Sequence, residues 1–392
     1  MGLIGSKGPD TKVEMREGSN VGIRIPVAAP DLSGNEEAYV IDAVRSSWIS
    51  SSGPYIDRFE HAFASFCEVD AAIGVCNGTV ALHLALLALG VRPGDEVLVP
   101  SLTYIATANA VRYVGAEPVF VDVDPATWCI DPTKLEDSIT RRTRGIIAVH
   151  LYGHPADMDV INHIAAVHGL WVVEDAAEAH GARYKGRNSG GLADVGTFSF
   201  YGNKIFTAGE GGAVTVRDHQ LALRMRTLRG QGMDPSRRYY FPITGYNFRI
   251  TNIACAILCA QLERREEILA RRQAVFDGYR ARLAGIPGIG FQPRAPWAEP
   301  APWLYCITVD AETYGRSRDE LAAMLADAGV DTRPFFIALH RLPPFREESN
   351  RRGEDLPETD RLSEQGLNLP TYAALTDEDL DQIADCIRQA AS

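Results

Sequence analysis

Nearly continuous apolar runs alternate with amphipathic stretches in the first half of the chain. Runs of this kind are typical of strands that are buried on both faces of a sheet. They lie at Ala71–Cys76, Glu96–Pro100, Pro118–Val123, Gly145–Leu151 and Leu170–Glu174. The stretches between them predict helices at Thr79–Leu89, Ile105–Val114, Thr133–Ile139 and Met158–His168. This alternation predicts an α/β fold with a mostly parallel sheet covered by helices.

The flanking regions complete this domain and indicate a second one. Helices are predicted at residues 35–47, at about 55–68 and from Asn252 to about Leu283, and short strands at Thr197–Phe200 and Ala213–Arg217. The Pro- and Gly-rich stretch Gly285–Pro302 is the best boundary candidate. Beyond it, a strand at Trp303–Val309 and helices at Arg318–Ala328 and Asp377–Ala391 suggest a smaller α+β domain. We therefore expect an arm at 1–34, a large domain at 35–260, and a long linking helix with a small C-terminal domain at 261–392.

Composition and charge exclude several classes of protein. The 392 residues carry a net charge of −12, which argues against a general nucleic-acid binder. No apolar run reaches the length of a membrane-spanning helix. The seven cysteines are scattered and include no CxxC pair, which favours a reducing cytoplasm.

Lys204 is the most informative residue of the chain. It lies between the aromatic run Phe198–Tyr201 and the glycine-rich turn Gly209–Gly212. Desolvation there would lower the pKa of the amine and free it to attack a carbonyl group. Upstream, an apolar strand ends at Asp175, where a carboxylate could hold a protonated pyridine nitrogen or cap the following segment. Lysine and aspartate together are what a pyridoxal phosphate site requires.

Other candidate residues follow the ends of predicted strands, where ligands bind in open α/β sheets. Gly78 and Thr79 open a helix, whose N-terminus could bind a phosphate or be an ordinary cap. Tyr104 could stack on a flat ring or pack in the core. Ser199 could offer its hydroxyl to a phosphate, and Glu178 lies one helical turn from Asp175.

Two histidines at a strand end allow a further interpretation. Tyr152, Gly153 and His154 follow a predicted strand and could shape the pocket, but His150 and His154 could equally be buried structural residues. No third ligand accompanies them at a metal-like spacing, so no metal site is predicted.

These residues resemble the sugar aminotransferases of the DegT/DnrJ/EryC1/StrS family, a branch of the fold-type-I pyridoxal phosphate enzymes. The likeness covers about residues 24–375, and its variants Ala177–His180 and Phe200–Lys204 look most like the GDP-perosamine synthase branch. The motifs that carry it lie at residues 48–51, 77–79, 100–110, 150–154, 174–182, 198–204, 209–212 and 245–252.

The resemblance implies a role for each site residue. Lys204 would form a Schiff base with pyridoxal 5'-phosphate and then move the proton, and Asp175 would hold the pyridine nitrogen. The other cofactor-binding residues would be Gly78, Thr79, Tyr104, Glu178, Ser199 and Asn247. Asn247 would reach the phosphate in the neighbouring subunit, which implies a homodimer with shared active sites, alone or within a tetramer. The substrate-binding residues would be Trp48, Ser50, His180, Arg333 and His340.

The implied reaction transfers an amino group from L-glutamate to C4 of GDP-4-keto-6-deoxymannose. A sugar 3-dehydratase of this family would carry histidine where Lys204 stands, which disfavours that activity. Other keto sugar nucleotides (3-keto, dTDP- or UDP-linked) or an aminocyclitol, in antibiotic or polysaccharide biosynthesis, remain alternative substrates. A non-catalytic relative that keeps the fold is the alternative from another class.

Overall fold

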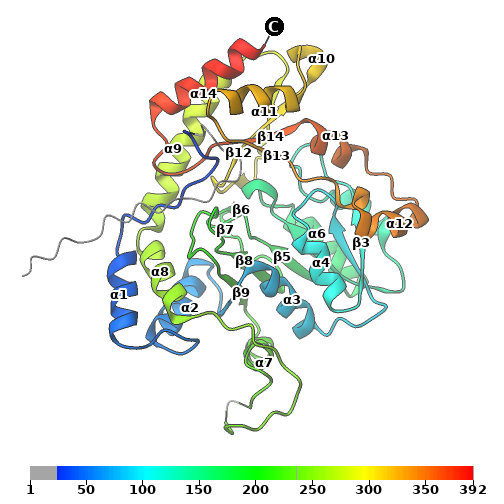
Figure 1. Ribbon diagram of the computed structural model, residues 1–392. Helices are drawn as coiled ribbons and strands as arrows, with labels where there is room; N and C mark the ends of the chain where they lie inside the picture. Colours follow the sequence, from blue (N-terminus) through cyan, green and yellow to red (C-terminus); the bar gives the residue numbers. More distant parts are fainter. Residues whose placement is uncertain (1–23, 235, 392) are drawn as a thin grey trace, which may run out of the picture.

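The large domain is built around a twisted, mostly parallel sheet (Figure 1). The computed structural model describes residues 24–234 and 236–391. Within them, seven strands form this sheet in the order β1-β9-β8-β5-β4-β2-β3. Their bounds are β1 Ala71–Val75, β2 Glu96–Pro100, β3 Glu117–Val121, β4 Thr143–Val149, β5 Trp171–Asp175, β8 Val195–Ser199 and β9 Gly212–Val216. Strand β9 runs antiparallel to both of its neighbours, and the other pairs are parallel. The expected fold class is therefore confirmed.

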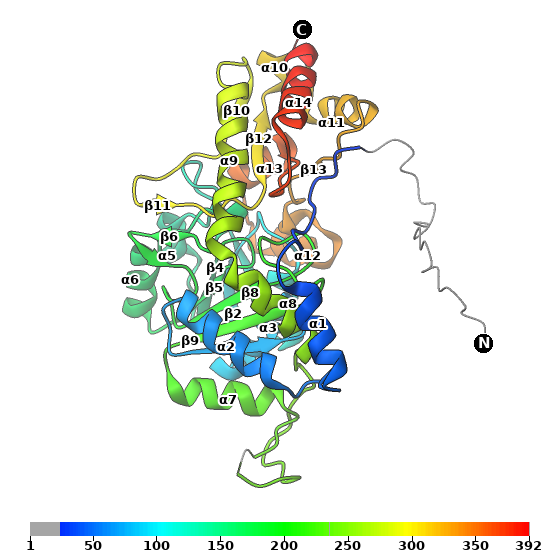
Figure 2. The ribbon, with the colours of Figure 1, turned by 90° about the vertical axis from the view of Figure 1, so that its left-hand side faces the viewer.

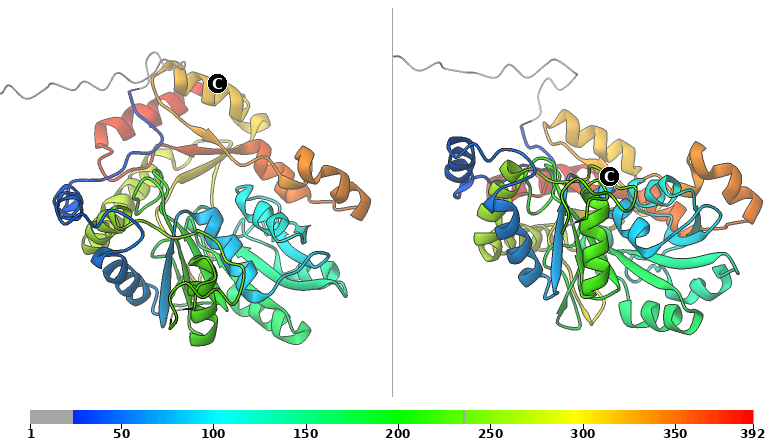
Figure 3. Two further views of the ribbon diagram at one scale, coloured as in Figure 1. Left: turned by 60° about the horizontal axis from the view of Figure 1, so that its bottom comes forward. Right: turned by 90° about the horizontal axis from the view of Figure 1, so that it is seen from below.

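Helices cover both faces of this sheet, as Figure 3 shows. One face packs against α2 Pro54–Phe66, α6 Met158–His168 and α8 Asn252–Glu263, and the other against α3 Gly78–Leu89, α4 Ala106–Tyr113 and α7 His219–Arg229. The outer helix α1 Glu36–Arg45 lies against α8. Burial on both faces explains why the strands are apolar throughout rather than alternating.

Short elements connect these layers. They are α5 Leu135–Ser138, the 3₁₀ turns Pro132–Lys134, Leu151–Gly153 and Leu339–Arg341, and a small sheet of β6 Arg183–Tyr184, β7 Arg187–Asn188 and β11 Ala298–Glu299. The single helix predicted at Thr133–Ile139 is thus a 3₁₀ turn followed by one helical turn.

The C-terminal domain has its own sheet and core. Its strands are β10 Ile289–Phe291, β12 Tyr305–Val309, β13 Arg333–Pro334 and β14 Gly366–Leu369, and its helices are α10 Ala311–Tyr314, α11 Arg318–Asp327, α12 Pro343–Arg352, α13 Pro357–Gln365 and α14 Asp377–Ala390. Helices α11 and α14 lie at the top in Figure 1, away from the large sheet.

Helix α9, Arg265–Leu283, connects the two domains as the long upright helix of Figure 2. The sequence predicted one helix from Asn252 to Leu283, whereas the structure ends α8 at Glu263, and Arg264 has φ −104° and ψ 12°. Ile268 belongs to a core of the large domain, while Val275 and Leu283 belong to the core of the small one. The change of core therefore falls inside α9.

The first described residues of the predicted N-terminal arm pack against the small domain and α9. The backbone of Ile25 pairs with Val330, and the carboxylate of Asp31 binds Arg264 and Arg271. Residues 1–23 of that arm lie outside the described residues. Across residues 24–234 and 236–391, no helix is both long enough and apolar enough to cross a membrane.

Candidate active site

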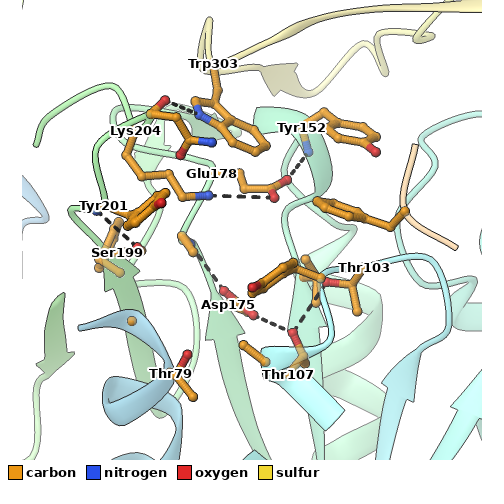
Figure 4. Close-up of a pocket in the computed structure, with 18 of the residues that line it drawn as sticks. Thr79, Thr103, Thr107, Tyr152, Asp175, Glu178, Ser199, Tyr201, Lys204 and Trp303 are labelled. Carbon is orange, nitrogen blue, oxygen red and sulfur yellow. Dashed lines mark hydrogen bonds and ion pairs between the residues drawn. The ribbon is translucent and has the colours of Figure 1, made fainter. Parts of the chain in front are cut away.

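A cavity of about 640 Å³ lies where the carboxyl ends of the parallel strands meet. Its wall includes Lys204, Asp175, Glu178 and the predicted phosphate-binding set Gly78, Thr79 and Ser199, together with Tyr104 and Arg333. Figure 4 shows several of these side chains pointing toward a common space. The volume is in the range of pockets that enclose a small molecule.

The N-terminus of α3 and the end of β8 form one side of the cavity. The side chain of Asn77 accepts a hydrogen bond from the Val80 N–H at 2.9 Å and so caps the helix. A Cβ on Gly78 would lie 2.7 Å from the Cβ of Ser199, so glycine is required for this close approach. The arrangement brings the first N–H groups of α3 and the Ser199 hydroxyl to one place, which suits an anion.

The close approach at Gly78 gives a direct test. We expect Gly78→Ala to weaken cofactor binding about 10-fold or more, because relieving the overlap displaces the helix end. Gly202→Ala is the matched control, since a Cβ there meets nothing within 4 Å. Titration of the cofactor into each variant measures the effect. Equal affinities would contradict an anion site at the N-terminus of α3.

Asp175 lies at the end of β5 in the buried part of the cavity. Its carboxylate accepts a hydrogen bond from Thr107 Oγ1 at 2.7 Å and one from the Ala177 N–H at 3.3 Å. Burial raises the pKa of Asp175, and these hydrogen bonds oppose that effect. A cation placed beside this carboxylate would therefore be stabilised.

Lys204 enters the cavity from the connection between β8 and β9. The N–H of Lys204 donates to the carbonyl of Tyr201 at 2.9 Å, which closes the turn that carries it. Its Nζ lies 3.8 Å from Glu178 Oε1 and 3.9 Å from the centre of the Trp303 ring. Burial lowers the pKa of the Lys204 amine and raises the pKa of the Glu178 carboxyl. The amine is thus poised as a nucleophile and base.

Glu178 is held in place by the backbone. Its Oε2 accepts a hydrogen bond from the Tyr152 N–H at 2.7 Å, which leaves Oε1 directed toward Lys204 (Figure 4). Tyr152 has a left-handed backbone with φ 51°. Strain of this kind occurs preferentially at functional sites.

The structure does not bring all predicted residues to this cavity. His180 is fully buried among Phe198, Phe200 and Phe206, and burial lowers its pKa to about 3. His340 is also buried, and its Nδ1 pairs with Ser101 Oγ at 2.8 Å. Neither of these described residues lines the cavity.

Trp48, Ser50 and Asn247 lie elsewhere on the surface of the chain. All three are exposed, and the described cavity wall does not include them. The backbone carbonyls of Trp48 and Ser50 accept hydrogen bonds from Asn252. Asn247 pairs with Gly230 in the loop after α7. These residues could therefore contact a ligand only in the site of another subunit, or after a movement of the segments that carry them.

Several cavity residues escaped prediction from sequence. They are Thr103, Thr107, Tyr201, Asn203, Glu210, Trp303 and Asn368. The sequence could have indicated Thr107, because it follows the predicted site residue Tyr104 within one helical turn. No feature of the sequence indicated Trp303 or Asn368, because both come from the small domain.

Comparison with known proteins identifies the family of the chain. The model of the DegT/DnrJ/EryC1/StrS aminotransferase family matches residues 30–388. A GDP-perosamine synthase of Caulobacter vibrioides is 50% identical over 367 residues, which cover 93% of this chain and 98% of the relative. A GDP-perosamine synthase of Escherichia coli O157:H7 is 42% identical over 366 residues, with coverage of 93% and 98%.

A solved structure shows the same fold. The structure of S. venezuelae DesV in complex with a ketimine intermediate has a TM-score of 0.85 and 39% identity, and the match covers 91% of this chain and 94% of that one. The resemblance, the fold type and the aminotransferase class expected from the sequence are thereby confirmed. The chain therefore belongs to the DegT/DnrJ/EryC1/StrS aminotransferase family.

Proposed function

We propose that this enzyme uses pyridoxal 5'-phosphate to move the amino group of L-glutamate to a keto-deoxy sugar nucleotide. C4 of GDP-4-keto-6-deoxymannose is the first candidate, which would make the reaction GDP-perosamine synthesis. The observation that carries the proposal is the largely buried Lys204 side chain, which shares one cavity with the Asp175 carboxylate and the N-terminus of α3. The names of the two relatives support the choice of sugar.

The residues fit this cofactor at its phosphate and at its ring nitrogen. Gly78, Thr79 and Ser199 would hold the phosphate, since the close approach at Gly78 leaves room for an anion and not for a side chain. Asp175 would pair with the pyridine nitrogen, and the half-exposed Tyr104 would lie against the ring. When bound, the cofactor supplies an electron sink for the substrate carbon.

Lys204 would perform the proton transfers. Its amine would take a proton from the α-carbon of the donor and deliver it to a cofactor carbon two atoms away, and later do the reverse with the sugar. Asp175 would keep the ring nitrogen protonated during both half-reactions. Glu178 and Tyr152 would keep the lysine aligned through their 2.7 Å hydrogen bond.

The loop after α7 supports the proposed dimer. It extends below the large domain in Figures 1 and 2, and it exposes Met233, Tyr239, Tyr240, Phe241 and Ile243. Large apolar side chains gathered on a projecting loop are typical of an interface. Asn247 lies in the same loop and would reach the cofactor phosphate of the partner subunit.

Shared sites predict complementation between two inactive variants. Lys204→Ala and Asn247→Ala homodimers should each be impaired, but a mixed dimer contains one site with both native residues. After subunit exchange in an equal mixture, we expect about a quarter of the wild-type activity. The rate of sugar amination measures this, and a mixture no more active than its components would exclude Asn247 from the partner's site.

A substrate panel tests the sugar. The purified enzyme is incubated with L-glutamate and with GDP-, dTDP- or UDP-linked keto sugars, and the aminated product is detected by its mass. Product from the GDP sugar alone would support GDP-perosamine synthesis. Product from another nucleotide alone would replace the proposed substrate and leave the aminotransferase reaction standing.

A further inference from the structure

The Lys204 amine is enclosed by two groups that both favour a cation. On one side lies Oε1 of Glu178 at 3.8 Å, and on the other the face of the Trp303 ring, whose centre is 3.9 Å away. An ammonium over an indole face is stabilised by the ring quadrupole, and more strongly when water is excluded. The Lys204 side chain is 11% exposed and Trp303 is 3% exposed, and this burial strengthens the interaction.

Trp303 is anchored at three points, which distinguishes a built site from a chance contact. Its Nε1–H donates to the carbonyl of Asn203 at 2.9 Å, next to Lys204 itself (Figure 4). Its own carbonyl accepts a hydrogen bond from Arg272, and that guanidinium also donates to the carbonyl of Pro302 at 2.8 Å. Its ring stacks on Tyr152 with centroids 6.1 Å apart.

The arginine that binds the Trp303 carbonyl, Arg272, is in an unusual environment. Arg272 is buried in α9, and its guanidinium donates hydrogen bonds to the backbone carbonyls of Pro302 and Trp303. Burial lowers its pKa to about 10. Within residues 24–234 and 236–391, no carboxylate forms an ion pair with Arg272. A buried charge without a counter-ion costs free energy, which is consistent with a functional reason for holding Trp303 in place.

We propose that Trp303 and Glu178 form a cation site that holds the protonated Lys204 amine whenever the lysine is not bound to the cofactor. Trp303 then acts as a positioning residue contributed by the small domain. It would keep the ammonium, which carries the abstracted proton, beside the reacting carbon atoms. The catalytic role of this site rests on the proposed function, but the effect of the site on the pKa of Lys204 can be measured without substrate.

The surroundings contain other groups that could affect the same amine. Asp175 favours the ammonium through its charge, and His180 is neutral because burial lowers its pKa to about 3. Glu210 and Arg333 also line the cavity. The experiment therefore changes Trp303 and Glu178 separately and leaves these groups in place.

The test is the titration of Lys204 in the full-length chain after removal of the cofactor. The sequence contains five lysines, Lys7, Lys12, Lys134, Lys185 and Lys204, so NMR of protein labelled with ¹³C at the lysine ε-carbon gives few signals. The signal lost in Lys204→Met identifies Lys204. We expect Trp303→Leu to lower the pKa of Lys204 by about one pH unit. We expect Glu178→Gln to lower it by about one to three pH units.

Two further variants distinguish the effect of the Trp303 ring on the Lys204 titration from a general effect of packing. Trp303→Phe keeps an aromatic face and should shift the titration by less than half as much as Trp303→Leu. Trp297→Leu removes a tryptophan that packs on Tyr184 and His154, and it should leave the titration unchanged. The proposal is overturned if Trp303→Leu does not move the Lys204 titration, or if Trp303→Phe moves it equally. Failure of the substrate panel would instead concern the proposed function alone.

Discussion

Replacing Lys204 with alanine is expected to lower the rate of amination by at least about 10³-fold, because the variant has no positioned base for either proton transfer. The fold should persist. Burying the Lys204 amine costs free energy, so its removal should leave the thermal midpoint unchanged or raised. Steady-state kinetics and thermal unfolding measure the two effects. Borohydride should no longer fix the cofactor to the chain, which mass spectrometry of the tryptic peptides detects.

Lys185→Ala is the matched control for this prediction. Lys185 is half-exposed and pairs with Asp159 at 2.7 Å, on the surface of the large domain. Its loss should change neither the rate nor the labelled peptide. Retention of full activity in Lys204→Ala would refute the assignment of this lysine.

Replacing Asp175 with asparagine is the second large expected effect. The amide keeps the shape of the side chain and removes its charge, so the ring nitrogen would lose the partner that keeps it protonated. A hydrogen bond to a charged group contributes about 1.5–3 kcal/mol, and we therefore expect a loss of rate of about 10- to 150-fold. The absorption spectrum of the bound cofactor should also change, since it reports the protonation of the ring.

Thr107→Val and Asp159→Asn complete this test. Thr107→Val removes the 2.7 Å hydrogen bond to Asp175 and should have a smaller effect of the same kind. Asp159→Asn changes a half-exposed carboxylate that pairs with Lys185 and Arg187, and activity should not change. Wild-type kinetics in Asp175→Asn would show that this carboxylate does not act on the cofactor.

Much of the large domain could be predicted because its signals are local. The strand that delivers Asp175 is apolar and short, and the helix that follows Gly78 has a clear cap, so each is recognisable within a few residues. Parallel strands then bring their carboxyl ends to one edge, which joins Lys204, Asp175 and Ser199 without further information. The break at Arg264 was missed because it interrupts a region of continuous helical pattern.

The histidines show the limit of such reasoning. His180 lies two residues from Glu178 in a motif that carries chemistry, yet its ring packs against three phenylalanines behind the cavity. His340 was expected near the substrate and instead binds Ser101. A sequence motif does not state which side of the backbone a side chain occupies. Within the same non-helical segment, Glu178 lines the cavity and His180 does not.

The sequence by itself determined the fold class, the family and the chemical types of the central residues, because these depend on hydrophobic periodicity and on motifs of a few neighbouring residues. Only the tertiary structure decided what surrounds the Lys204 amine. Glu178 faces it because the distant Tyr152 N–H orients the carboxylate, and Trp303 faces it because the small domain docks there through Arg272. These contacts join segments far apart in the chain, and their directions follow from packing that no local pattern encodes.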